Sequence, residues 1–81
     1  MLTLTLRHNE QVNLGDNLLE IISIYEECIY IEYNKQQHKI LKDQTITLGT
    51  STIQYKRTRK HKGVVIGLSS PQKILRRKDH V

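Results

Sequence analysis

The chain has 81 residues, enough for one small domain, and 37% of them are hydrophobic, with neither Trp nor Phe. Its apolar residues are mostly Ile, Leu and Val, which favour strands, and no apolar run approaches the roughly 20 residues that span a bilayer. The net charge of +5 is unevenly divided: residues 1–44 carry four Lys or Arg against seven Asp or Glu, and residues 45–81 carry nine against one. This asymmetry indicates either a surface for a polyanion or only a solvated basic end.

The first half of the chain predicts five short strands. Apolar and polar residues alternate from Leu2 to Arg7, and a tight turn follows in which Asn9 tolerates a positive φ. The segment Leu18–Tyr25 is ambiguous because its apolar residues also fit a helical turn, but its β-branched content favours a strand. A polar loop is expected over Asn34–Gln37. The predicted strands are Leu2–Arg7, Gln11–Leu14, Leu18–Tyr25, Ile29–Tyr33 and His38–Leu41.

The second half predicts four more strands with short connections. A turn is expected over Lys60–Gly63, and Pro71 should end the most apolar strand because proline cannot donate to a central ladder. The predicted strands are Ile46–Leu48, a long polar strand that starts at Ile53, Val64–Leu68 and Lys73–Lys78. About nine strands without a convincing helix predict an all-β sandwich or barrel in a single domain, residues 1–81.

The two halves share a pattern. Gln11–Asp16 matches Thr45–Thr50, and Ile29–Asn34 matches Val64–Ser69. The sequence therefore predicts an internal repeat of residues 1–44 and 45–81, in which the second copy lacks a counterpart of the first strand. Short repeats rarely bury an apolar face alone, so we expect the two copies to pack on each other.

Residues that carry enzymatic or metal chemistry are not evident in the sequence. Cys28 is the single cysteine, which excludes an intrachain disulfide, and the four His residues lack metal-ligand spacing. Ser69, Ser70, Asp79 and His80 lie in no nucleophile-elbow context. The expectation is a protein that is not an enzyme, has no cofactor and, in the absence of a secretory signal pattern, is cytoplasmic.

Several segments resemble a known family at matched spacing. Met1–Arg7, then Glu10 and Val12–Asp16, is similar to the opening of the carbon storage regulator (CsrA/RsmA) family. Residues 46–81 resemble the same family from its second strand to just past its fifth, most clearly over Gly63–Pro71. The chain thus resembles one full copy followed by one copy without strand one.

The resemblance implies a fold and a function. Family members are small β dimers with interleaved strands, and they bind GGA-containing hairpin loops of mRNA near ribosome-binding sites. Strand one of one subunit and strand five of the other form the binding surface. The expectation is a post-transcriptional regulator that binds mRNA or small regulatory RNA, with no membrane and no small-molecule substrate. A fused, monomeric pseudo-dimer with one composite site is expected, and a homodimer stays possible.

The resemblance also names candidate RNA-binding residues at the two ends of the chain. Leu6 departs from the family, which has Arg there, and so does Lys78, where the family has Arg. Both departures bear on GGA recognition, because Leu6 has no guanidinium group and Lys78 lacks the bidentate fork of Arg. The predicted RNA-binding residues are Leu4, Arg7, Ile74, Arg76, Arg77 and Lys78.

A basic hairpin supplies candidate auxiliary phosphate contacts, namely Lys56, Arg57, Arg59, Lys60 and Lys62. Three alternatives remain at this point. The basic residues could only protect a strand edge or raise solubility. The chain could also be a degenerate family member that binds proteins and antagonises a true regulator, or a nonspecific nucleic-acid binder.

Overall fold

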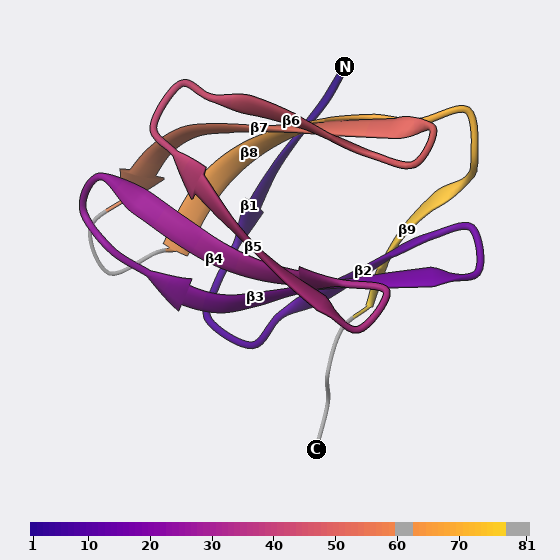
Figure 1. Cartoon of the computed structure of the whole chain (residues 1–81), viewed down its shortest axis with the longest axis horizontal. Helices are drawn as coiled ribbons and strands as arrows, with labels where there is room; N and C mark the ends of the chain where they lie inside the picture. Colours follow the sequence, from indigo (N-terminus) through magenta and orange to yellow (C-terminus); the bar gives the residue numbers. More distant parts are fainter. Residues whose placement is uncertain (60–62, 78–81) are drawn as a thin grey trace.

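The computed structural model describes residues 1–59 and 63–77. Within these residues the chain forms nine strands and no helix, which confirms the all-β prediction (Figure 1). No helix that could cross a membrane is present in this part of the chain. The strands are β1 (Leu2–Leu6), β2 (Gln11–Leu14), β3 (Asn17–Ile24), β4 (Cys28–Tyr33), β5 (Gln36–Leu41), β6 (Thr45–Leu48), β7 (Ser51–Arg59), β8 (Gly63–Ser69) and β9 (Ile74–Arg77).

The strands form two antiparallel sheets that pack face to face. Sheet A has the order β1-β8-β7-β6, and sheet B has the order β5-β4-β3-β2-β9. In Figure 1 sheet A lies above sheet B. The chain changes sheets between β1 and β2, between β5 and β6 and again between β8 and β9, so each half of the sequence contributes strands to both sheets.

Local sequence explains two differences from the predicted strands. A bulge between Ile21 and Ser23 places an extra residue, Ile22, in β3. The bulge interrupts the apolar–polar alternation, which is why the segment also fitted a helical turn. The helical alternative for this segment is therefore wrong. Asn34 and Lys35 both have positive φ values, 52° and 66°, and form a two-residue turn, so β5 begins two residues earlier than predicted.

The core lies between the sheets and consists of inward-facing aliphatic side chains with one aromatic residue, Tyr55. The Tyr55 hydroxyl donates to the main-chain carbonyl of Glu26 at 3.2 Å and also contacts the Thr58 hydroxyl. This bond joins β7 of sheet A to the β3–β4 turn of sheet B. The fully buried core side chains include Leu6, Val12, Leu14, Leu19, Ile21, Ile29, Ile31, Ile40, Ile53, Val64 and Ile66.

The two halves of the chain repeat the same hydrogen bonds. The Asn9 amide donates to the Ile21 carbonyl at 2.8 Å, and the Asp43 amide donates to the Tyr55 carbonyl at 2.8 Å. Asn9 and Asp43 both have positive φ, 69° and 67°, as expected for Asn9. Bulges follow at equivalent places, after Ile21 in β3 and after Tyr55 in β7.

This correspondence assigns β5 a role that the sequence did not predict. Leu6 of β1 pairs with Val64 of β8, and Ile40 of β5 pairs with Ile29 of β4, in matching registers. Strands β1–β4 thus correspond to β5–β8, and β5 stands where the second copy was expected to have no first strand. By strand pairing, the structural counterpart of β1–β4 therefore begins at β5, whereas the similarity of the turns in the sequence placed the second copy at residue 45.

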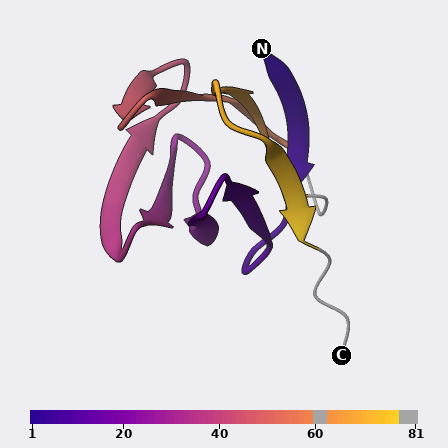
Figure 2. The same ribbon diagram turned by 90° about the vertical axis from the view of Figure 1, so that its right-hand side faces the viewer.

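Strand β9 lies outside this correspondence. It pairs with β2, with Ile74 opposite Leu14, and the described part of the chain has no equivalent strand on β6. The expectation that the first strand would lie beside the last is corrected, because β1 pairs with β8 at the edge of the other sheet. Figure 2 shows β1 and β9 running in the same direction on one side of the molecule.

Candidate nucleic-acid interface

The outer face of sheet A gathers residues from β1, β8 and β7. Alternation along the strands directs every second residue away from the core. Thr5 stands opposite Val65, which stands opposite Arg57, and Thr3 and Gln54 flank Gly67 in the same way. These rows form a face of hydroxyl and amide groups over a middle strand with small side chains.

One end of this face is basic. Arg59 stands opposite Gly63 on β7 and β8. On the other side of Gly63, a methyl group in place of its hydrogen would lie 3.0 Å from the Arg7 Cα, so Arg7 borders the same glycine. Arg7, Arg57 and Arg59 are all exposed. The fold therefore brings together cations that lie about 50 positions apart in the chain.

The bulge in β7 directs the side chain of Lys56 toward the other end of this face, over Gly67. The bulge between Tyr55 and Arg57 leaves Lys56 without a partner in the register, and its Cε lies 3.0 Å from where a Gly67 Cβ would be. Met1 covers the same glycine from the β1 side, since its Cγ is also 3.0 Å from that position. Gly67 thus provides room for a lysine stem and a methionine on the outer face.

Charge is distributed differently over the two sheets. The four strands of sheet A carry Lys56, Arg57 and Arg59 and no Asp or Glu. In sheet B, Glu20 of β3 stands opposite Glu32 of β4 on the outer face. These unlike faces make sheet A the favourable side for a polyanion.

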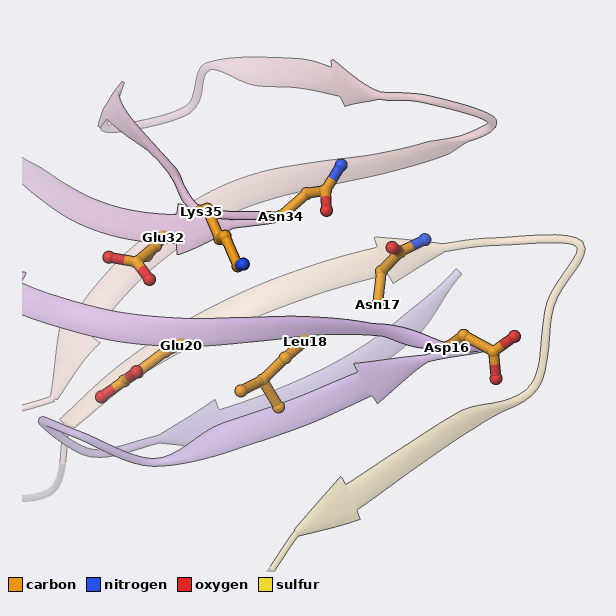
Figure 3. A pocket seen from close by; sticks show the side chains of 7 residues that line it. All are labelled: Asp16, Asn17, Leu18, Glu20, Glu32, Asn34 and Lys35. Atoms are coloured by element: carbon orange, nitrogen blue, oxygen red, sulfur yellow. The ribbon is translucent and has the colours of Figure 1, made fainter.

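The acidic outer face of sheet B has a shallow cavity of its own, of about 330 Å³. Figure 3 shows its side chains, which come from β3, β4 and the turns that follow β2 and β4. It contains three carboxylates, of Asp16, Glu20 and Glu32, and one cation, Lys35. In the part of the chain that the structure describes, no three His, Cys, Asp or Glu side chains are arranged so that they could hold a metal ion.

The structure separates the predicted RNA-binding residues into two groups. Arg7 is exposed, and its turn is held by the Glu10 carboxylate, which accepts from the Arg7 amide at 2.6 Å. Leu4 and Ile74 instead pack against the core from β1 and β9. Both of these side chains are partly buried. Leu6, at the end of β1, is fully buried.

Some of the remaining predicted residues lie outside the part of the chain that the structure describes. The main chains of Arg76 and Arg77 belong to β9, opposite Val12 and Gln11. Lys78 and the hairpin residues Lys60 and Lys62 lie outside the described residues.

Sequence patterns missed three contributors to this face, Thr3, Thr5 and Gln54. Their register across β8 places them beside the cations. The alternation of Thr with Leu in β1 was the one signal for the two threonines, and only the partner strand shows which residues they approach. Comparison with family models, curated proteins and solved structures yields no match to this chain.

Proposed function

We propose that this chain is a cytoplasmic post-transcriptional regulator that binds single-stranded mRNA or small regulatory RNA on the basic outer face of sheet A. The observation that carries the proposal is the convergence of Arg7, Arg57 and Arg59 on a face whose strands contain no carboxylate. The resemblance of the sequence to carbon storage regulators supports GGA-containing hairpin loops as the preferred ligand.

The chemistry of the face fits a single strand. Arginine side chains neutralise phosphates and can stack on unpaired bases. Thr3, Thr5 and Gln54 offer hydroxyl and amide groups to base edges, and β1 presents open main-chain groups because it is the edge strand of sheet A. The outer rows of sheet A described above contain no aromatic residue, so stacking depends on the guanidinium planes.

One RNA segment should bind per chain. In sheet B, the positions that correspond to Arg7, Arg57 and Arg59 hold Leu41, Ser23 and Tyr25. None of these three side chains carries a positive charge. A second, equivalent RNA site on the same chain is therefore not expected.

The test compares three RNAs by fluorescence anisotropy: a GGA hairpin, the same hairpin with a mutated loop, and an unrelated single strand. Tight binding of the first alone, at one per chain in calorimetry, is expected. If three or four cations engage phosphate, log affinity should fall with log salt with a slope of roughly −2 to −3.

Two variants locate the site. Arg7→Ala should weaken binding about tenfold, the equivalent of about 1.4 kcal/mol. Lys42→Ala, which removes the same charge from the corresponding turn before β6, should leave binding unchanged. No binding to any of the three RNAs would favour the protein-binding alternative, for which the acidic row of Glu20 and Glu32 is the candidate surface.

A further inference from the structure

The outer face of sheet A changes character along β8, from the arginines beside Gly63 to mostly uncharged side chains around Gly67. Thr3 of β1 and Gln54 of β7 stand opposite Gly67 in the two strand registers. Four steps of extended chain separate the two glycines, which corresponds to about 13 Å. The surroundings of Gly67 are therefore available to a different part of an RNA strand whose phosphates lie at the arginines.

Gly67 leaves the main chain of β8 without a side chain of its own on this face. Glycine inside a strand costs stability and often marks a place that another group approaches closely. The three atoms nearest to a Cβ placed there belong to flexible side chains, namely Sδ and Cγ of Met1 and Cε of Lys56. Both side chains are unbranched, and Met1 is 66% exposed, so they can move apart and let a flat ring reach the main chain.

The corresponding place on sheet B has the opposite chemistry. Gln54 and Gly67 stand opposite each other in sheet A, and their counterparts in sheet B are Glu20 and Glu32. Sheet B therefore has a carboxylate side chain where sheet A has bare main chain, and a second carboxylate where sheet A has an amide. The combination of a glycine with a neighbouring amide occurs on the sheet whose outer face is proposed to bind RNA.

We propose that Gly67, Met1, Lys56 and Gln54 form a subsite for one unpaired guanine of the bound RNA, an inference that rests on the proposed function. The ring lies on the Gly67 main chain, against the stems of Met1 and Lys56. The Lys56 ammonium donates to O6 and N7 of the base, and the Gln54 carbonyl oxygen accepts from its N2 amino group. Proteins read unpaired bases on these Hoogsteen and Watson–Crick edges.

The charge of Lys56 selects guanine among the four bases. Guanine offers a cation two adjacent acceptors, O6 and N7, whereas adenine has an amino group beside its N7. Uracil offers a single oxygen on this edge. The amino groups of adenine and cytosine need an acceptor such as a carboxylate, and the four strands of sheet A carry no Asp or Glu. A lysine on a sheet without carboxylates therefore favours guanine.

Base analogues in the GGA hairpin test the subsite one contact at a time, with fluorescence anisotropy on the full chain. Each guanine of the loop is replaced in turn by 7-deazaguanine, which lacks the N7 acceptor, or by inosine, which lacks the N2 amino group. At one of the two guanines, either analogue should lower the affinity about fivefold, as expected for the loss of one hydrogen bond.

Two variants assign these losses to side chains. Lys56→Met keeps an unbranched stem over Gly67 and removes the ammonium, so it should bind the 7-deazaguanine hairpin as well as the guanine hairpin. Gln54→Leu should abolish the difference between inosine and guanine and keep the effect of 7-deazaguanine. The matched control is Lys39→Met on sheet B, opposite Tyr30, which removes the same charge and should leave both effects intact.

Gly67→Val fills the subsite directly. The nearest atoms that must move are the ends of flexible side chains, so the variant should fold, and its affinity for the hairpin should fall several-fold. The subsite is wrong if the hairpin binds and Arg7→Ala weakens it, yet Lys56→Met responds to 7-deazaguanine as the unaltered chain does. Unchanged affinity of Gly67→Val would also overturn it. If the unaltered chain binds none of the RNAs, the proposed function fails and the subsite fails with it.

Discussion

The inner faces of the two sheets are alike, and their outer faces differ. Leu6 and Ile40 occupy corresponding positions on β1 and β5, and both are fully buried. On the outer faces, Arg57 and Arg59 correspond to Ser23 and Tyr25. Core packing restricts the inward residues to apolar side chains, whereas outward residues vary at little cost to stability. The same fold can therefore present a basic face and a face with tyrosines and carboxylates.

The outer face of sheet B carries a pair of tyrosines at the place that corresponds to the cations of sheet A. Tyr25 and Tyr30 pack edge to face, with ring centroids 5.8 Å apart and an interplanar angle of 81°. Val65 is the counterpart of Tyr30 on sheet A and stands opposite Arg57. A proposed ligand site on one sheet thus corresponds to an aromatic pair on the other.

The largest expected effect tests the likeness of the inner faces. Leu6→Ala and Ile40→Ala should each lower the free energy of unfolding by about 2–5 kcal/mol, because each removes buried methyl groups and leaves a cavity. The two losses should be similar, as the positions correspond. Urea denaturation followed by circular dichroism measures both, and a loss in one variant only would show that the two sheets contribute unequally to the core.

The next effect tests the difference between the outer faces. Arg57→Ala combined with Arg59→Ala should weaken RNA binding by about 10–100-fold, or about 1.4–2.8 kcal/mol, and reduce the salt slope by about 1.4. The matched control, Lys35→Ala with Lys39→Ala, removes two charges from the β4–β5 hairpin of sheet B. Anisotropy titrations at several salt concentrations should show a changed slope for the first pair alone, and equal losses for both would contradict a localised site.

A smaller effect concerns the hydroxyl that joins the two sheets. Tyr55→Phe should cost about 1–2 kcal/mol of stability, because the carbonyl of Glu26 loses its partner in a partly buried place. Tyr25→Phe makes the same chemical change on a side chain that is 55% exposed and should be close to neutral. Thermal and urea denaturation compare the two, and a neutral Tyr55→Phe would show that this bond adds nothing to the docking of the sheets.

The smallest expected difference compares the covered and open strand edges. Gly49→Ala should cost about 1–2 kcal/mol, the usual penalty for a left-handed backbone with a Cβ. Gly15→Ala should carry the same backbone penalty and a small additional cost, because the side chain of Gln72 must move. Chemical denaturation of the pair measures the increment. A larger loss for Gly49→Ala would mean that its surroundings are not open.

Strand identity could be predicted from local pattern, because a side-chain period of two is a property of a few adjacent residues. The alternation from Leu2 to Leu6 predicted β1, and Pro71 correctly marked the end of β8. The left-handed turn at Asn9 was also predicted from residue type. Charge asymmetry is likewise a property of the sequence alone, as is the clustering of nine basic residues in residues 45–81.

Strand partners could not be predicted this way, because pairing depends on which edges meet after the chain changes sheets. Tertiary structure decided that β5 corresponds to β1 and that β9 covers β2 rather than lying beside β1. It also decided that Leu4 and Ile74 face the core while Arg7 joins Arg59 across Gly63. The sequence by itself determined the strands, the turns and the sign of the charge; the register between distant strands determined which cations share a face and which edge stays open.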